Sequence, residues 1–459
     1  MPEARSPEAT REEFQGPYCP IEPVSALGTP GPQDALIEAE IVAGRGPDST
    51  LEYQPRPARR ALAALRHREF RLYWSGQLVS LVGTWMQVVA QNWLVLELSD
   101  SALVLGILTA LQFLPILLLS VFGGVLADRL PRRTLLLVTQ PASLGLALVL
   151  GVLTQTGAVR IGYVMVLALL LGVVNAVDMP TRQAFVVDLV DPTDLPNAIA
   201  LNSAAFNSAR LVGPAIGGVA IGAVGLAGAF YLNGLSFLPA IATLLPLRAG
   251  REPAVCPSER IPVLDDLREG LRYVARTPLV RLVILLVALV GTFGLNLAVL
   301  VPVLARNTIG VGASGYGYLA AAAGAGSLGA ALFLASLART PSPAVLVAMA
   351  GVLGLLEVAA VGVTQFLPAL LLLFGIGFAM VFFVTLANTL VQTAAPSPLR
   401  GRVMSVYTTV FAGTTPLGSL FAGSLAQALS AGAAFAVCGT ICIAAAAVGW
   451  ILQPTRRLP

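Results

Sequence analysis

The sequence predicts an all-α membrane protein with twelve transmembrane helices in two pseudo-symmetric six-helix bundles. Of its 459 residues, 56% are hydrophobic and 11% are charged, whereas soluble domains carry about 25% charged residues. Apolar runs of about 20 residues, the length that crosses a bilayer as a helix, recur along the chain from residue 71 onward. One longer polar gap, 248–279, divides these runs into six and six.

Four parts of the chain differ in composition. Residues 1–60 are rich in Pro, Glu, Gly and Ser without an apolar period, so we expect a disordered cytoplasmic tail. Residues 61–247 and 280–459 each hold six predicted spans and form the expected N-terminal and C-terminal bundles. Between them, 248–279 is the expected cytoplasmic linker, and its stretch 265–276 has the pattern of an amphipathic helix. The predicted spans are 71–97, 102–127, 134–155, 161–187, 198–223, 228–247, 280–305, 314–338, 343–363, 366–394, 402–429 and 432–453.

The distribution of arginine predicts the orientation of these spans. The sequence contains no lysine, and with the N-terminus inside the cell the outer loops carry only Arg160 and Arg306. Nearly all other arginines then fall in inner loops and tails. Because cytoplasmic loops carry the excess of positive residues, we expect a multi-pass protein of the inner or plasma membrane with both termini in the cytoplasm.

A charged turn separates the second and third predicted spans. Charges this dense must leave the hydrocarbon core, because a charge at the bilayer centre is costly. The turn resembles the loop between helices 2 and 3 of the major facilitator superfamily, written Gly-x-x-x-Asp-Arg-x-Gly-Arg-Arg, although Pro131 replaces the second glycine. A plain basic loop is the alternative. The matching residues are Gly124, Asp128, Arg129, Arg132 and Arg133.

The resemblance implies the major facilitator fold and suggests a gate at this turn. We hypothesise that Asp128 meets the start of the eleventh span at Gly401 when the inner side is closed, because a helix N-terminus favours an anion. Arg132 and Arg402 would add charge partners. The alternative is that Asp128 only neutralises the arginines of its own loop.

The fifth predicted span carries a second motif, Gly-Pro-x-x-Gly-Gly, formed by Gly213, Pro214, Gly217 and Gly218. Pro214 removes a helix hydrogen bond and is expected to kink the span, while the glycines allow close packing. The motif is similar to one in the antiporters of the superfamily, which implies export rather than uptake. Simple packing of small residues is the alternative, but it does not account for Arg210 beside the motif.

Further stretches narrow the resemblance within the superfamily. Residues 178–185, 195–198, 202–203 and 400–405 look like the branch that contains the enterobactin exporter and the macrolide efflux proteins. The likeness extends over about 70–450. It specifies the superfamily and the direction of transport, but it does not specify the cargo.

Polar residues recur along one side of several predicted spans and indicate a water-filled cavity. In this superfamily, spans 1, 4, 7 and 10 line the central path. Hydrogen bonds between helices are the alternative for any single residue. The candidate cavity residues are Gln77, Thr84, Gln87, Gln91, Asn175, Asn207, Asn296, Thr385 and Asn388.

Proton coupling requires a carboxylate inside the membrane, and Asp178 is the first candidate. Counting residues from the loop between spans 4 and 5 places Arg210 at a similar depth, and Arg182 lies one helical turn from Asp178. A permanent ion pair that holds the fold together is the alternative. Glu357 in the ninth span is the second candidate, although a protonated carboxyl facing a neighbouring helix would also explain it.

Together these features predict a secondary active efflux transporter that exports an amphipathic small molecule, such as a drug, siderophore or metabolite, by proton antiport with alternating access. Uptake of a polar nutrient and a non-transporting receptor are the alternatives. With the single His67 and this spacing of the cysteines, we expect no metal site, no catalytic residue and no enzyme activity. We expect no cofactor besides the proton gradient, no nucleic-acid partner, and a monomer that contacts only its cargo and the bilayer.

Overall fold

The computed structural model describes residues 62–248, 263–337, 341–396 and 399–453. These residues belong to one unit, Ala61–Val255 with Glu259–Pro459. The expected tail, 1–60, and most of the linker lie outside the described residues. Within the described ranges, all regular secondary structure is helical.

The N-terminal half begins with a short 3₁₀ turn, η3 (Ala63–Arg66), and continues with five long helices. The last of them, α6, covers two predicted spans because its chain leaves helical angles only at Gly225 (φ 71°, ψ 178°). A residue with a side chain would be strained there, and glycine is not. The backbone keeps helical angles at Pro214, and the departure at Gly225 falls in the predicted gap between the spans 198–223 and 228–247. The helices are α2 (Arg68–Ser99), α3 (Ala102–Arg129), α4 (Arg132–Gln155), α5 (Ile161–Asp188) and α6 (Leu195–Leu244).

The C-terminal half begins with α7, which matches the amphipathic part of the linker, and its first span is interrupted at 295–296. Asn296 stabilises the interruption, because its amide donates hydrogen bonds to the carbonyls of Thr292 (2.7 Å) and Phe293 (3.0 Å), which end α8. The elements are α7 (Val263–Arg276), α8 (Pro278–Gly294), α9 (Leu297–Val303), η4 (Leu304–Ile309), α10 (Ala313–Ser336), α11 (Pro343–Ala359), η5 (Ala360–Gly362), α12 (Phe366–Ala394), α13 (Arg400–Ala428) and α14 (Ala431–Leu452).

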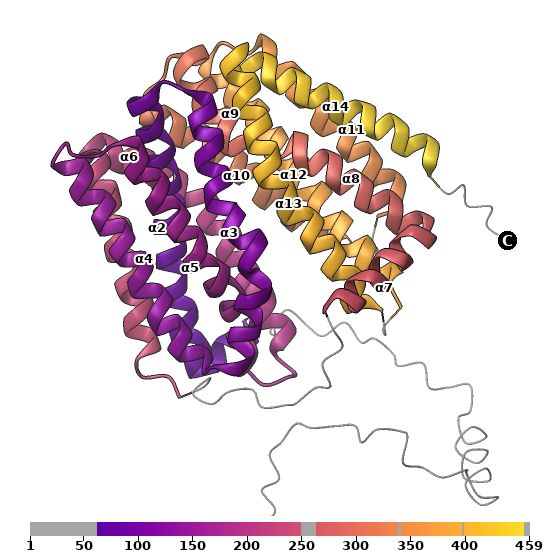
Figure 1. Ribbon diagram of the computed structural model, residues 1–459, viewed down its shortest axis with the longest axis horizontal. Coiled ribbons are helices and arrows are strands. Elements are labelled where there is room, and N and C mark those ends of the chain that lie inside the picture. The colour runs from indigo at the N-terminus through magenta and orange to yellow at the C-terminus, as the bar shows by residue number, and fades with distance from the viewer. Residues whose placement is uncertain (1–61, 249–262, 338–340, 397–398, 454–459) are drawn as a thin grey trace, which may run out of the picture. The chain divides into compact units, whose positions relative to one another are not determined.

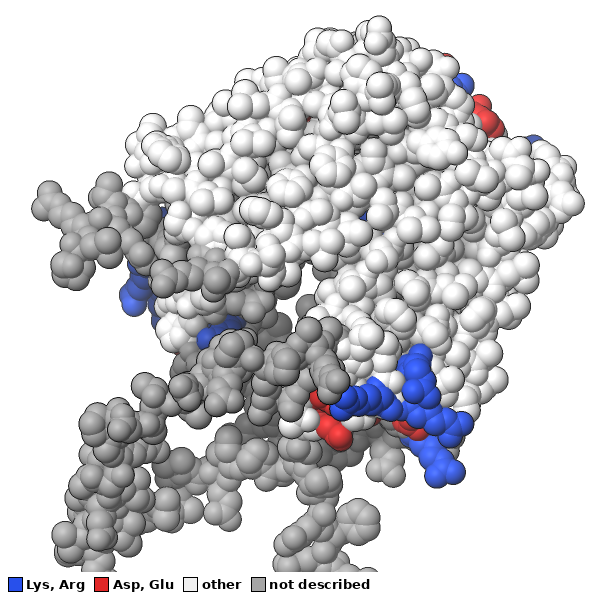
Figure 2. Space-filling model, turned by 180° about the vertical axis from the view of Figure 1, so that it is seen from behind, with Lys and Arg blue, Asp and Glu red and all other residues white. Residues whose placement is uncertain are grey.

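Ten helices in the described part of the chain are long and apolar enough to cross a membrane. Dividing α6 at Gly225 and adding the more polar α13 gives the twelve spans of the predicted fold. In Figure 2, a broad uncharged surface separates charged side chains that gather mainly toward the ends of the helices. This distribution suits a protein whose middle faces lipid.

The two halves meet along two helix pairs, α3 with α13 and α6 with α10 (Figure 1). Glycines allow the close approach on both sides. A Cβ added at Gly218 would lie 2.9 Å from the carbonyl oxygen of Ser314 and 3.0 Å from Gly317 Cα, and one at Gly423 would lie 2.7 Å from the carbonyl oxygen of Ala102. Backbone contact of this kind is typical of helix packing in membranes.

Candidate functional site

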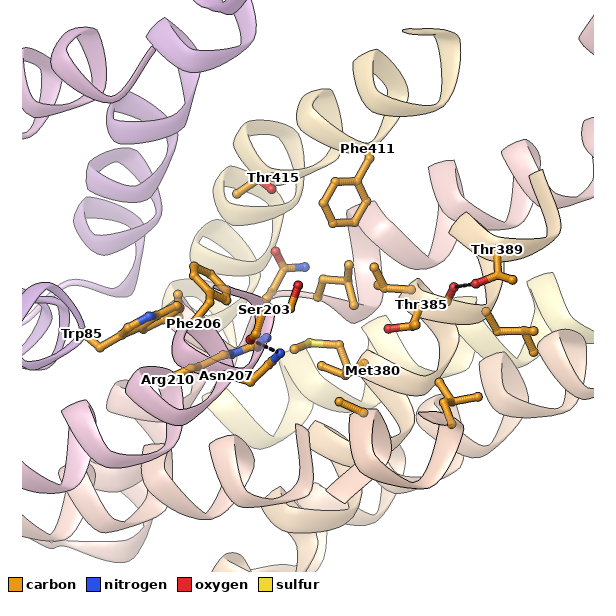
Figure 3. A pocket seen from close by; sticks show the side chains of 18 of the residues that line it. Trp85, Ser203, Phe206, Asn207, Arg210, Met380, Thr385, Thr389, Phe411 and Thr415 are labelled. Carbon is orange, nitrogen blue, oxygen red and sulfur yellow. Dashed lines mark hydrogen bonds between the residues drawn. The ribbon is translucent and has the colours of Figure 1, made fainter. Parts of the chain in front are cut away.

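A cavity of about 820 Å³ lies between the two halves. Residues of α2, α3 and α6 line it on one side, and residues of α9, α10, α12 and α13 line it on the other. This volume is within the range of cavities that hold drug-sized molecules. The lining residues labelled in Figure 3 are Trp85, Ser203, Phe206, Asn207, Arg210, Met380, Thr385, Thr389, Phe411 and Thr415.

One face of α6 supplies most of the polar groups on the N-terminal side. Ser203, Phe206, Asn207 and Arg210 follow the spacing i, i+3, i+4, i+7, which places them on one side of a helix. Asn207 donates to the carbonyl of Ser203 at 2.9 Å, within its own helix. Figure 3 shows this face opposite threonines and apolar side chains of the C-terminal half.

Arg210 contacts Trp85, which forms an aromatic pair with Phe206 in this wall. The guanidinium carbon lies 5.7 Å from the ring centroid of Trp85, the distance of a cation–π contact. The Trp85 and Phe206 rings are themselves 5.7 Å apart and meet edge to face at 75°. The wall therefore joins one positive charge to two large apolar surfaces.

The structure brings some of the predicted cavity residues together and places the others elsewhere. Asn207, Asn296 and Thr385 line the cavity. The remaining candidates are not among its lining residues in this structure, so a role for them in the cavity stays a prediction. They are Gln77, Thr84, Gln87, Gln91, Asn175 and Asn388.

Several of these polar residues form hydrogen bonds with other side chains outside the cavity lining. Gln87 accepts from Asn233 on α6 at 2.5 Å and donates to Gln91 at 3.5 Å, so two glutamines belong to a buried contact between α2 and α6. Asn388 accepts from Gln392 on its own helix at 2.5 Å. The bond between Gln87 and Asn233 is of the interhelical kind that the alternative interpretation described, whereas the bond of Asn388 lies within its own helix.

Several lining residues could not be recognised from polarity. Ala331, Leu334 and Ala335 of α10 and Phe411 of α13 line the cavity but resemble any apolar residue of a membrane helix. Their position depends on how the two halves meet, which single-span patterns do not contain. Phe113 and Phe206 could be singled out as aromatic residues within spans, and both line the cavity.

Asp178 is buried, with 3% of its surface exposed, in a network between α5 and α4. It forms an ion pair with Arg182 one turn away and accepts hydrogen bonds from Thr139 (2.6 Å) and Gln140 (2.8 Å). Arg210 contacts Trp85 instead and is not among the ion-pair partners of Asp178. The expectation of two guanidinium groups beside Asp178 is therefore corrected to one. Depth along a helix gave no information about which way each side chain points.

Glu357 lies on α11, faces α14 and is not among the residues that line the cavity. It is 1% exposed, and its Oε2 has no hydrogen-bond partner. A Cβ added at Gly439 would lie 2.8 Å from Glu357 Cβ, so the acid packs directly against the α14 backbone. This position agrees with a carboxyl that faces a neighbouring helix.

At one end of the helices, polar contacts join the two halves. Asp100 and Arg306 form an ion pair at 3.4 Å, and Gln427 accepts a hydrogen bond from the backbone amide of Ala102 at 2.8 Å. Asn92, which is 4% exposed, donates to the carbonyl of Ala298 (3.1 Å) and to the Tyr316 hydroxyl (3.2 Å). We call this end the Asp100 end, and it is closed.

At the opposite end, which we call the Arg132 end, the charged residues pair within their own halves. Arg132 pairs with Asp188 at 2.5 Å, and Arg402 pairs with Glu269. Asp128 is exposed and has no hydrogen bond or ion pair among the described residues. No ion pair or hydrogen bond joins the described parts of the two halves at this end, so the predicted contact between Asp128 and Gly401 is not made in this conformation.

The other residues of the predicted gate serve local packing. Arg133 donates to the carbonyls of Leu244 (2.9 Å) and Leu245 (2.7 Å) at the end of α6. Gly123, and not Gly124, provides the close approach, because a Cβ at Gly123 would clash with the carbonyl of Ala176 while one at Gly124 would meet open space. Arg129 is exposed beside the apolar surface of α3.

The second motif lies where α6 crosses two neighbours. Added Cβ atoms at Gly213 and Gly217 would press on Trp85 and Met86 of α2, whereas one at Gly218 would press on α10 of the other half. The motif therefore determines how closely the cavity wall and the interface between the halves can pack. Packing alone accounts for its glycines.

Comparison with known sequences gives matches along nearly the whole chain. Residues 59–456 match the family described as transmembrane secretion effector, a group of the major facilitator superfamily. The multidrug efflux pump Tap of Mycolicibacterium fortuitum is 29% identical over 370 residues, which cover 77% of this chain and 88% of the pump. The MFS-type transporter YfiS of Bacillus subtilis (strain 168) is 29% identical over 384 residues, covering 80% and 89%. The Staphyloferrin A transporter of Staphylococcus aureus (strain NCTC 8325 / PS 47) is 34% identical, but this chain spans only 34% of its length and the match covers 29% of this chain.

Solved structures share the fold. A bacterial homolog of the human lysosomal transporter Spinster, in an inward-facing occupied conformation, aligns with a TM-score of 0.64 at 16% identity, over 84% of this chain and 97% of that one. A peptide transporter POT in complex with alafosfalin aligns at 0.67 with 12% identity, over 87% and 98%. These likenesses show the fold, and the match over residues 59–456 shows that the chain belongs to the transmembrane secretion effector family of the major facilitator superfamily.

Proposed function

We propose that this protein is a secondary active efflux transporter that exports an amphipathic small molecule by proton antiport with alternating access. The observation that carries the proposal is the cavity between the two halves, which has mostly apolar walls and is closed at the Asp100 end. Transporters of this architecture bind cargo near the middle of the membrane and expose it to one side at a time.

The arginine distribution suggests how the protein is oriented in the membrane. If the Arg132 end faces the cytoplasm, as the excess of positive residues there suggests, the conformation is inward-open and ready to load cargo from inside the cell. Both termini are then cytoplasmic, in the inner or plasma membrane. We propose that the protein works as a monomer, because the cavity is built from a single chain.

Export is favoured over uptake by the cavity and by the relatives. Arg210 is the one charged side chain among the described lining residues, whereas a site for a polar nutrient would need more. Tap is a multidrug efflux pump by name. A receptor without transport activity is the remaining alternative, and neither the paired faces of the cavity nor the family of transporters favours it.

For the proton, we propose the pair of Asp178 and Arg182. Protonation of Asp178 would release Arg182 and weaken the hydrogen bonds from α4. The backbone of α5 just before Asp178, at Ala176, presses on Gly123 of α3, and α3 packs against α13 in the other half. A change at Asp178 can therefore reach the interface between the halves through one helix, without an acid in the cavity itself.

The test is accumulation of a panel of fluorescent drugs and siderophores in efflux-deficient cells with and without the protein. Lower accumulation that an uncoupler abolishes supports proton antiport. Lower accumulation that survives the uncoupler would contradict proton coupling, and higher accumulation would indicate uptake. If no compound is affected, although the protein is folded and present in the membrane, the receptor alternative gains support.

A further inference from the structure

The described residues that line the cavity include one positively charged side chain and no acidic one. Arg210 is the one charged side chain among the described residues that line it. The acids of the spans have other positions: Asp178 pairs with Arg182, and Glu357 packs against α14. We infer that Arg210 and Trp85 form the binding site for the anionic group of the cargo, so that the cargo is an amphipathic carboxylate. This inference rests on the transport function proposed above.

The hydrogen-bonding capacity of Arg210 supports the inference. A guanidinium has five N–H donors in a planar fork, and none of them donates to an acceptor of the described chain. Its contact with Trp85 is made through the ring face, which leaves the edge of the fork free. A carboxylate can accept two parallel hydrogen bonds from that edge, the arrangement in which such pairs are strongest.

The surroundings of Arg210 determine the rest of the cargo. Phe113 and Phe206 are 39% and 42% exposed, and both line the cavity, so large aromatic faces are available within it. Across the cavity, Met380 and Phe411 add apolar surface and Thr385 adds a hydroxyl (Figure 3). One charge beside this much apolar surface suits a monoanion with an aromatic or aliphatic body. A second anionic group would find no positive partner among the described lining residues.

A structural role is the competing explanation. Arg210 could simply stabilise Trp85 through the cation–π contact, and the cavity would then accept neutral or cationic compounds equally well. The two explanations differ in how the protein treats a pair of ligands that share one apolar body and differ only in charge. Wild-type protein alone can separate them, so the test does not depend on the folding of a variant.

The experiment measures binding of dansyl-6-aminohexanoate and its primary amide to the full-length protein in lipid nanodiscs at neutral pH. We expect the acid to bind at least about tenfold more tightly than the amide, because a carboxylate accepts stronger hydrogen bonds from a guanidinium than a neutral amide does. In Arg210→Gln, affinity for the acid should fall to that of the amide. In Arg210→Lys, part of the preference should remain, because the charge stays but the fork is lost.

Arg281→Gln is the matched control, because Arg281 is exposed on α8 and is absent from the cavity lining. It removes the same charge and should keep the wild-type preference. Wild-type protein that does not distinguish acid from amide overturns the inference, as does an Arg210→Gln variant that keeps the preference. Carboxylate binding without export in cells would instead contradict the transport function and leave the anion site in place.

Discussion

Asp178 has an environment that supports either a proton site or a structural ion pair. Its two oxygens accept from Arg182, Thr139 and Gln140, and it lies among buried side chains. Breaking a buried pair by removing one partner costs about 3–5 kcal/mol when a charge is left behind. Asparagine keeps the size and one acceptor oxygen, so the two roles can be separated with little change in shape.

We predict that Asp178→Asn is folded and inserted, binds cargo, and no longer exports against a gradient. The proton would have no site to occupy, although the cavity is unchanged. The measurement is uncoupler-sensitive export from cells or proteoliposomes, with binding to purified protein as the companion. Thr139→Val is the matched control, because it removes one hydrogen bond to Oδ1 of Asp178 and leaves the carboxylate in place. Undiminished uncoupler-sensitive export by a well-folded Asp178→Asn would exclude Asp178 as the proton site.

Unlike Asp178, Glu357 has a carboxyl oxygen without a hydrogen-bond partner among the described residues. Its Cβ packs against the backbone of α14. An unpaired ionised carboxylate there would be very costly, so we expect the neutral acid. We predict that Glu357→Gln, which resembles that acid in size and polarity, leaves uncoupler-sensitive export within about twofold of wild type. A complete loss of coupling with normal cargo binding would transfer the proton site from Asp178 to Glu357. Expression and thermal stability of the variant check that the helix contact is preserved.

At the scale of helices, the sequence predicted the spans well but could not predict where they break. Length and apolarity identify most of the spans, but not the more polar α13. The interruption at Asn296 depends on a side chain that bonds to the last carbonyls of α8, and asparagine inside an apolar run does not reveal this role. Likewise, spacing placed Gln87 on a polar face but could not show that Asn233 of α6 would meet it.

The crossing of α6 and α10 is the element-scale feature most sensitive to substitution. Gly218 and Gly317 face each other: a Cβ at Gly218 would lie 3.0 Å from Gly317 Cα, and one at Gly317 would lie 2.7 Å from Gly218 Cα. A larger side chain at either position would therefore overpack the crossing. We predict that Gly218→Val destabilises the closed Asp100 end by about 1–3 kcal/mol. Spin labels placed across that end should report longer distances than in wild type.

Gly145→Val is the control for this substitution, because a Cβ at Gly145 meets nothing within 4 Å. It introduces the same β-branched residue into a helix of the same half and tests the propensity effect alone. Equal distance changes in the two variants would show that the helix crossing does not control closure. A change confined to Gly218→Val would support the glycine contact as its cause.

At the scale of the whole molecule, the sequence could suggest the partners of the gates but not the conformation adopted. Asp128 was predicted to meet the start of α13 when the inner side is closed, and in this structure it is exposed and forms no ion pair or hydrogen bond with the described part of α13. The Asp100 and Arg306 pair was not recognisable from the sequence, since its members are more than 200 residues apart. The contacts of this one conformation therefore do not test the predicted contact of Asp128 with α13, which would form in another conformation.

Alternating access requires that the two ends respond in opposite directions. Asp100→Asn removes the ion pair at the closed end, where the partners are 75% and 30% exposed, so the effect should be at most about 1 kcal/mol toward opening that end. Asp128→Asn removes an anion expected to stabilise closure of the Arg132 end, so it should leave that end open more of the time.

We therefore predict opposite shifts for the two variants, measured by spin-label distances across each end in proteoliposomes. Asp100→Asn should lengthen distances at the Asp100 end and shorten them at the Arg132 end, whereas Asp128→Asn should do the reverse. Asp191→Asn is the control, because Asp191 is a highly exposed acid at the Arg132 end whose nearest ion-pair partner is His67 at 4.0 Å. Its distances should match wild type. If Asp128→Asn behaves like Asp191→Asn, Asp128 does not gate, and if both ends open together in either variant, the halves do not move as the rocking model requires.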